Sequence, residues 1–244
     1  MAAPVIVQTD TFASPAAGVT QTKSITAQAG LSMIVVWLHV KPGGSGQKAT
    51  GVTVNGVAAT EAVGADSGNS SLARTQCFYV VSPASGTYDV VVTNSTTIRS
   101  HMTIQQITGS ETANPVRTAV AASPGSANTL PTVAVASAVD DLVLDACCSV
   151  NGDTVTATVG SDQTEKSNFV GFPGGGANSI RAVTSTEPGA SSVTMSWTWS
   201  GAEFWKLGAI SIKPAGGGGG GLPEPVLSAP GFAGGFQVHS GGLD

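Results

Sequence analysis

Six carboxylates are the side chains that come closest to hydrolase chemistry in this sequence. They are Asp140, Asp141, Asp145, Asp153, Glu187 and Glu203. A glycosidase needs two such groups flanking the scissile bond. Their contexts favour structural roles, since Asp140 and Asp141 precede a strand pattern, Asp153 belongs to a hairpin turn and Glu203 caps a loop. No G-x-S-x-G pattern accompanies them. We therefore predict no catalytic residues and no enzymatic activity.

Metal and cofactor sites are also not expected from the spacing of polar residues. Oxygen ligands for calcium could come only from a loosely spaced group, Asp140, Asp141, Asn151 and Asp153, which does not match the D-x-D-x-D-G loop. The histidines, His39, His101 and His239, follow no metal-binding pattern. The glycine-rich stretch 171–176 lacks a following G-K-[ST], so we interpret it as a surface loop. We expect no metal and no cofactor.

Three tryptophans near the end of the chain leave two interpretations open. Trp197 and Trp199 are two residues apart, so they point to the same face of a strand, and Trp205 follows on the next strand. If that face is exposed, the row of rings could stack on sugars. If it is buried, the rings belong to the core, where large aromatic side chains usually lie.

Composition points to a protein that works in contact with neighbours. The chain has 244 residues, of which 41% are hydrophobic and only 10% are charged, against about 25% in typical soluble domains. Its surface must therefore be built mainly from small and uncharged polar residues. The net charge is −5 and no run of Lys or Arg occurs, so we expect no binding to nucleic acid.

Cysteines and apolar runs indicate the cellular context. Cys77, Cys147 and Cys148 do not form a disulfide framework, because adjacent strand residues point to opposite faces. We predict free thiols and synthesis in a reducing host cytoplasm. The longest apolar run, 33–38, is much shorter than the roughly 20 residues that span a bilayer. The first residues lack the basic and apolar regions of a secretory signal, so neither a signal peptide nor a membrane partner is expected.

Strand patterns dominate the sequence, and no segment keeps a helical period. In the first half, strands are predicted at 32–40, 51–60 with an Asn55-Gly56 hairpin turn, 74–81, 87–93 and 101–108. In the second half they are predicted at 132–136, 141–150, 154–159, 179–184, 192–200 and 204–213. The expected fold class is all-β.

The two halves resemble each other. SPASGTYDVVVT in the first half matches TEPGASSVTMSW in the second, and HMTIQQI matches FWKLGAI. We therefore predict an antiparallel β-sandwich or jelly roll over residues 20–214, preceded by a separate segment 1–19. Its halves, about 20–110 and 130–214, would pack face to face and share one core. The alternative is two tandem domains joined by the stretch ETANPVRTAVAASPGS.

Residues 215–244 are predicted to form a glycine-rich hinge followed by an extended docking arm. Gly216 to Gly221 supply the hinge, and the prolines that follow favour an extended backbone. The residues expected to contact a partner are Leu222, Pro223, Pro225, Val226, Phe232 and Phe236. The segment 2–11 is expected to reach neighbouring subunits as well. The alternative is a tail that has no partner.

The chain resembles β-sandwich structural proteins of tailed bacteriophages over residues 20–213. The segments that carry this resemblance are GVTVNGVAAT, RTQCFYVVSPASGTYDVVVT, HMTIQQITG and DDLVLDA. The resemblance implies a capsid decoration protein or a head or tail appendage, located in the virion. It also implies a homo-oligomer, such as a trimer, with capsid or other virion proteins as partners and no catalytic residues. The alternative function is a carbohydrate-binding or adhesin module of a phage tail fibre, which would use Trp197, Trp199 and Trp205.

Overall fold

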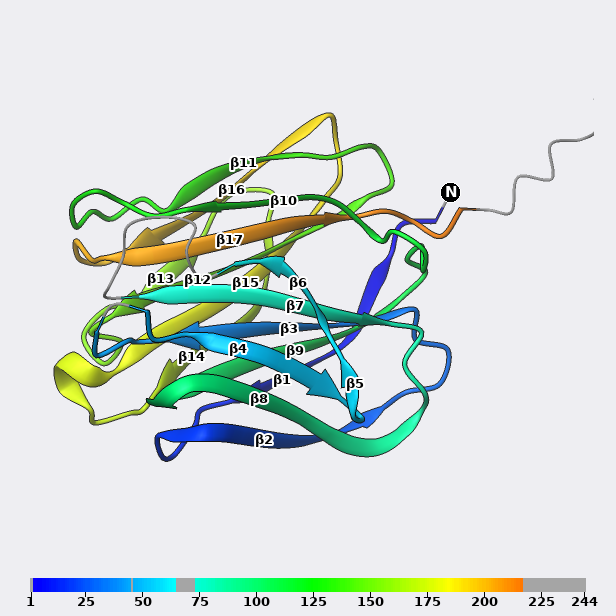
Figure 1. Ribbon diagram of the computed structural model, residues 1–244. Helices are drawn as coiled ribbons and strands as arrows, with labels where there is room; N and C mark the ends of the chain where they lie inside the picture. The colour runs from blue at the N-terminus through cyan, green and yellow to red at the C-terminus, as the bar shows by residue number, and fades with distance from the viewer. Residues whose placement is uncertain (1, 45, 65–72, 217–244) are drawn as a thin grey trace, which may run out of the picture.

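The computed structural model describes residues 2–44, 46–64 and 73–216. Strands make up most of this part of the chain, and the helical element within it is a single short 3₁₀ turn, η1 (Gly176–Asn178). Within the same residues, no helix is long and apolar enough to cross a membrane. The all-β class predicted from the sequence is confirmed, and the sheets pack against one another as antiparallel layers (Figure 1).

The first half of the chain forms two antiparallel sheets. The larger sheet has the order β1 (Val5–Phe12), β9 (Ser100–Thr108), β3 (Met33–Val40), β7 (Arg74–Val81) and β6 (Thr60–Val63). The smaller one has the order β2 (Gly18–Ala27), β8 (Gly86–Ile98), β4 (Ala49–Val54) and β5 (Val57–Ala58). The Asn55-Gly56 hairpin turn predicted between β4 and β5 is confirmed, because both residues have positive φ, 51° and 75°.

The second half repeats this plan. Its larger sheet has the order β10 (Val116–Ala122), β17 (Trp205–Ile212), β12 (Leu142–Val150), β15 (Ile180–Pro188) and β14 (Thr164–Gly171). Its smaller sheet has the order β11 (Thr132–Ala136), β16 (Ser192–Trp199) and β13 (Ala157–Val159). Taken in chain order, each strand of the first half except β5 has a counterpart at the same place in the second, so the two halves share one topology.

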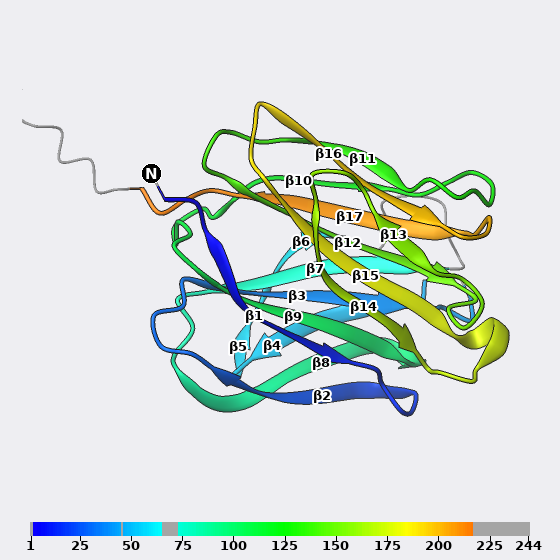
Figure 2. The same cartoon turned by 180° about the vertical axis from the view of Figure 1, so that it is seen from behind.

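The four sheets stack as layers, with the two larger sheets in the middle (Figures 1 and 2). Apolar clusters fill each gap. One lies between the two sheets of the first half, a second pair lies between those of the second half, and another joins the two larger sheets. The structure thus corrects the expectation of one shared core, because each half encloses a core of its own and the halves meet at a further apolar layer.

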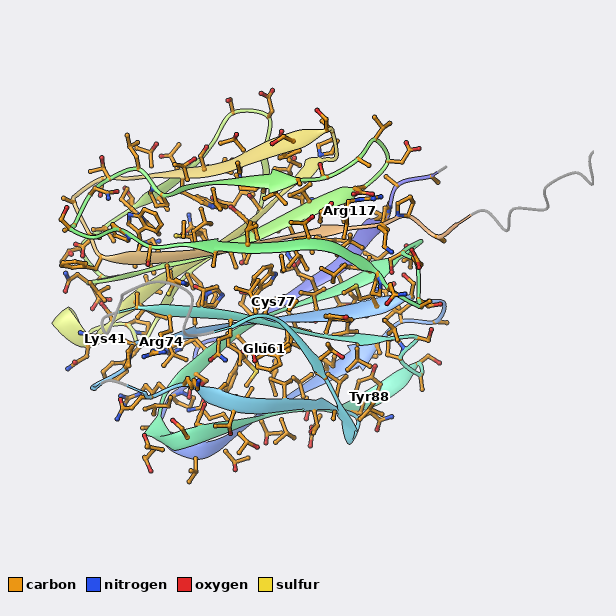
Figure 3. All side chains as sticks on the ribbon, turned by 45° about the horizontal axis from the view of Figure 1, so that its top comes forward. Lys41, Glu61, Arg74, Cys77, Tyr88 and Arg117 are labelled. Atoms are coloured by element: carbon orange, nitrogen blue, oxygen red, sulfur yellow. The ribbon has the colours of Figure 1, made fainter. Side chains whose placement is uncertain are left out.

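The burial of strand β3 on both faces explains why a further apolar layer forms between the two halves. All eight of its residues are buried, because alternate side chains serve different layers. Ile34 and Val36 pack into the core of the first half, whereas Val35 and Trp37 pack against the second half. Cys77 of β7 points into this same central layer (Figure 3). A strand buried on both faces has a continuous apolar run rather than an alternating one.

The central layer is arranged with approximate twofold symmetry. Strand β1 lies against β14, and its counterpart β10 lies against β6, the counterpart of β14. Likewise β7 contacts β12 and its counterpart β15 contacts β3, while β3 contacts its own counterpart β12. The halves therefore meet as two copies of one sandwich meet in a symmetric dimer, through equivalent surfaces.

The N-terminal segment, expected to precede the sandwich, belongs to it, and so does the stretch that the tandem-domain alternative treated as a linker. The N-terminal segment forms β1, which pairs with β9 from Val5 to Phe12, and its Ile6 packs on the central layer. The stretch considered as a linker contains β10, which pairs with β17 and places Val116 on the same layer. The backbone groups of 5–12 that face β9 are thus used within the chain. Contact of the segment 2–11 with neighbouring subunits stays a prediction.

We predict that Gly152→Ala strongly destabilises the protein. A Cβ atom at residue 152 would overlap the carbonyl group of Ile180, and backbone cannot move aside as a flexible side chain can. The expected loss is about 3 kcal/mol of unfolding free energy, measurable by urea denaturation. Gly51→Ala is the matched control, because nothing lies within 4 Å of its Cβ position. Equal stability of the two variants would contradict the packing at this turn.

Candidate functional site

The acidic candidates are spread over separate structural roles. Asp145 is fully buried and accepts three hydrogen bonds, from the backbone N–H of Ser185 (2.8 Å), from the Ser185 hydroxyl (2.7 Å) and from the Trp197 indole N–H (2.8 Å). Burial raises its pKa to about 6. Asp141 forms a bidentate ion pair with Arg117, at 2.6 and 3.1 Å. These carboxylates therefore support the second sandwich.

The remaining acidic candidates hold loops. The carboxylate of Asp153 accepts hydrogen bonds from the backbone N–H groups of Gly174 (3.2 Å) and Gly176 (3.0 Å), and so fixes the glycine-rich loop. Glu203 accepts a hydrogen bond of 3.0 Å from the Asn151 amide. Across residues 2–44, 46–64 and 73–216, His, Cys, Asp and Glu side chains do not gather in threes around a point where a metal could bind.

The tryptophan row is part of the core. Trp197, Trp199 and Trp205 are 1%, 2% and 4% exposed, and they pack together between the two sheets of the second half. Indoles in that position have no free face on which a sugar ring could stack. The structure thus corrects the alternative that placed them on an exposed glycan-binding platform.

The cysteines and the arm residues complete the sequence-based candidates. Cys77, Cys147 and Cys148 are free and buried, as predicted. Burial raises the pKa of each thiol, that of Cys148 to about 11, which keeps the thiols protonated at neutral pH. The predicted contact residues of the arm lie outside the described residues: Leu222, Pro223, Pro225, Val226, Phe232 and Phe236.

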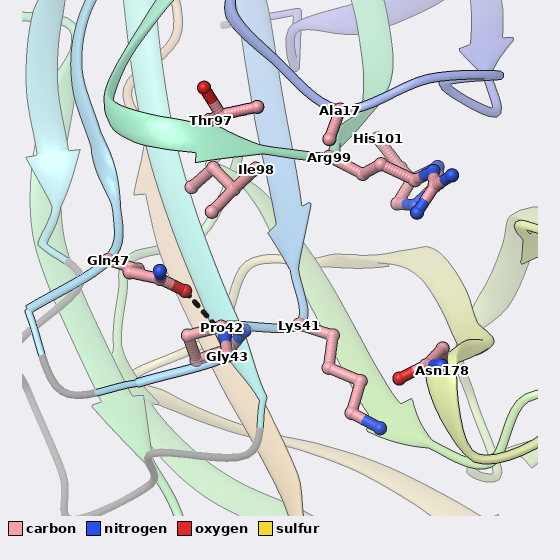
Figure 4. Close-up of a pocket in the computed structure, with 10 residues that line it drawn as sticks. All are labelled: Ala17, Lys41, Pro42, Gly43, Gln47, Thr97, Ile98, Arg99, His101 and Asn178. Atoms are coloured by element: carbon pink, nitrogen blue, oxygen red, sulfur yellow. Dashed lines mark hydrogen bonds between the residues drawn. The ribbon is translucent and has the colours of Figure 1, made fainter.

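A pocket of about 240 Å³ opens at the seam between the two halves, where β3 ends and β9 begins. Lys41 and Pro42 follow β3, and Arg99 directly precedes β9, to which His101 belongs. Asn178 comes from η1 in the second half. In Figure 4, Arg99 and His101 lie side by side, and Lys41 extends toward Asn178. The pocket is therefore built mainly by the first half, and the second half closes it at Asn178.

The charged groups of this pocket are cations. Lys41 and Arg99 line it, and among the described residues of its wall there is no carboxylate. The guanidinium of Arg99 stacks on the Phe172 ring at 3.8 Å, which orients its planar donor groups. Partial burial lowers the pKa of Lys41, as expected for an ammonium group that gains no compensating anion.

His101 adds a neutral donor. The backbone N–H of Ser14 donates to its Nδ1 at 2.9 Å, so the proton of the neutral ring must sit on Nε2. Burial and the charge of Arg99 lower its pKa to about 4, which keeps the ring neutral at physiological pH. The ring lies flat against Gly171, where a Cβ would come within 2.8 Å of three ring atoms. Gly171 thus allows the close approach of the two halves.

We predict that acidification destabilises the protein through His101 and its cross-strand neighbour His39. Burial lowers their pKa values to about 4 and about 3, with smaller contributions from the charge of Arg99 on His101 and of His101 on His39. In the unfolded chain both titrate near 6.5, so their contribution is complete above that pH and is lost as the pH falls toward 4. Asp145, with a raised pKa, opposes this but has the smaller shift.

The expected result is a melting temperature lower by roughly 10 °C at pH 4.5 than at pH 7.5. His101→Gln, which keeps an acceptor for Ser14, should remove about half of this difference. A pH dependence that is identical in the variant and the parent would show that His101 titrates normally.

Sequence reasoning did not find the pocket. Lys41 and Arg99 are isolated cations next to predicted strands, and Asn178 lies between the glycine-rich stretch 171–176 and the strand predicted at 179–184. Lys41 and Arg99 become neighbours through the pairing of β3 with β9, and Asn178 reaches them through the packing of the halves.

Comparisons with protein-family models, with curated proteins and with solved structures find no match for this chain.

Proposed function

We propose that this protein is a virion structural protein, a capsid decoration protein that contacts neighbouring subunits through its sandwich faces and its C-terminal arm. The observation that supports this most is the chemistry of the two outer faces of the stack. Both faces are sheets whose outward side chains are mainly hydroxyls, with almost no charge.

The outer sheet of the second half contains no charged residue in its three strands. Its buried positions on β16 alternate with outward ones, so valine, methionine and tryptophan face the core. The outward residues of β16 are Ser192, Thr194, Ser196 and Thr198.

The outer sheet of the first half has a similar face. Its outward residues on β2 and β8 include Thr20, Thr22, Ser24, Thr26, Thr87 and Thr93. The single acid among them, Asp89, accepts a hydrogen bond from the hydroxyl of Ser24. Lys23 is paired with the buried Val90 and so faces inward on the edge strand β2, a placement that discourages uncontrolled strand pairing.

Faces of this kind suit permanent contact. A charge buried at an interface must be desolvated and paired, whereas a hydroxyl can exchange a water for a partner at much lower cost. The centres of protein interfaces are correspondingly depleted of charged residues. On a symmetric particle, many such contacts act together because each bound subunit raises the effective concentration of the next contact.

The described chain ends in a position that suits an arm. The backbone N–H of Ala215 donates to the carbonyl of Gly109 at 2.6 Å, close to Ala3 and Pro4. Both ends of the described chain therefore lie at the same end of the stack, away from its outer faces (Figures 1 and 2). Residues 217–244 continue the chain from this end.

Deletion of residues 217–244 tests the arm. We expect incorporation into particles to fall about tenfold or more, because the arm's contacts are lost, while the melting temperature changes by less than about 2 °C. A second variant keeps the full length of the chain and replaces four apolar residues of the arm with serine: Leu222, Val226, Phe232 and Phe236. It should show the same loss of incorporation. Normal incorporation of both variants would contradict the role of the arm, and a large drop in melting temperature would mean that it folds back on its own sandwich.

A further inference from the structure

The geometry points to the seam pocket as a binding site for a small oxyanion: the carboxylate or phosphate group of a ligand about the size of a monosaccharide, held by Lys41 and Arg99. This inference does not rest on the proposed structural role. It requires only that the two sandwiches stack as observed, since Asn178 belongs to one half and the two cations to the other.

The donors on the pocket wall are of the right kind for an oxyanion. Lys41 supplies an ammonium group, Arg99 a planar fork of N–H donors, and His101 a ring whose remaining proton is on Nε2. Charge-assisted hydrogen bonds from such groups to carboxylate or phosphate are stronger than neutral ones. The chain as a whole is acidic, with a net charge of −5, so a pocket lined by two cations and no acid is a local reversal of its charge.

Both cations remain available for a ligand. In the part of the chain that the structure describes, neither Lys41 nor Arg99 forms an ion pair, and the Nε of Arg99 is buried without a hydrogen-bond partner. Stacking of Arg99 on Phe172 orders the guanidinium in advance, so less conformational entropy is lost when a ligand binds.

Size limits the ligand. A volume of about 240 Å³ lies below the roughly 300–1,000 Å³ typical of pockets for drug-sized molecules. Inorganic phosphate fits with room to spare, and a single sugar ring carrying an acidic group fills the space better. Pro42, Ile98 and Ala17 supply apolar wall, against which the uncharged part of such a ligand can pack.

Isothermal titration calorimetry on the full chain tests the proposal with four probes: inorganic phosphate, glucuronate, glucose 1-phosphate and uncharged glucose. At low ionic strength we expect at least one anion to bind with a dissociation constant of about 1 mM or tighter, and glucose not to bind. Binding of the phosphate compounds alone, or of glucuronate alone, supports the site and identifies its preferred group. Raising NaCl from about 20 to about 300 mM should weaken binding.

Variants assign the binding to this pocket. Lys41→Gln and Arg99→Gln should each weaken anion binding about tenfold or more. Lys166→Gln makes the same charge change on the exposed part of β14 and should leave binding unaltered. Melting temperatures check that each variant is folded, and Lys41→Gln still decides the outcome if Arg99→Gln is unstable. The proposal is overturned if none of the three anions binds, or if all three variants bind them equally.

Discussion

Trp37→Ala should lower the free energy of unfolding by about 3–5 kcal/mol, the largest effect we expect from a single substitution. The Trp37 side chain is fully buried in the layer that joins the two halves. Its indole N–H donates to Gln105 at 3.1 Å, so truncation also removes a buried hydrogen bond. A cavity at this position weakens the contact between the halves rather than one core alone.

On the opposite side of this layer, strand β17 has a glycine where it faces the Trp37 ring. Gly208 of β17 faces Trp37, and a Cβ atom there would come within 3.3 Å of Cζ3 of the ring and 3.1 Å of a Val63 methyl group. Because backbone and ring already touch, the surrounding strands have little freedom to collapse into the space that truncation would leave.

The chain has four tryptophans, and the three that remain in Trp37→Ala, Trp197, Trp199 and Trp205, all lie in the second half. Their fluorescence therefore reports on one half, whereas far-ultraviolet circular dichroism reports on both. We expect the two urea transitions to coincide in the parent and to move to lower urea together in the variant. Val139→Ala, at a side chain that is 76% exposed, is the control and should have little effect. A variant as stable as this control would contradict the role of the central layer.

Asp145→Ala should destabilise the protein by about 3 kcal/mol or more. The substitution removes the acceptor of the Trp197 indole N–H and of the Ser185 backbone N–H, both inside the second sandwich. Asp145→Asn retains one acceptor oxygen but turns an N–H₂ group toward the other donors, so a smaller loss is expected. Equal stability of the parent and Asp145→Ala in urea denaturation would contradict this network.

The loss should also depend on pH. The pKa of Asp145 is raised in the folded state to about 6, from 3.8. Its contribution is therefore complete below the unfolded value and declines as the pH rises through 6. The difference in unfolding free energy between the parent and Asp145→Ala should consequently be larger at pH 4.5 than at pH 7.5, by about 3 kcal/mol at most. A difference that grows with pH instead would mean that the folded state favours the ionised carboxylate.

The strands that sequence reasoning missed have a common position. They are β1, β2, β6, β10 and β14, and all five are edge strands of their sheets. An edge strand has one neighbour instead of two and is partly exposed, as the mixed burial of β1 and β14 shows. Polar residues are tolerated there, so the apolar period is weak. Interior strands such as β7 and β12 are buried along nearly their whole length and were predicted close to their observed bounds.

The sequence contains one signal for the stacking of the halves, which the prediction of a single sandwich did not take into account. The run MIVVWLHV in β3 has no alternation, which indicates burial on both faces and hence a layer on each side. The pocket left no such signal, because Lys41, Arg99 and Asn178 are far apart in the chain. Lys41 and Arg99 meet through the pairing of β3 with β9, and Asn178 joins them where the two halves pack. A site made by two packed surfaces depends on their relative orientation, which no local pattern encodes.

The most direct test of the proposed role is quantitative mass spectrometry of purified particles from the source of this chain. A decoration protein occupies equivalent positions on a symmetric lattice, so we predict a fixed molar ratio to the main shell protein that survives repeated gradient purification. Absence of the chain from the purified particles, or a ratio that falls toward zero with each gradient, would contradict a structural role in the virion.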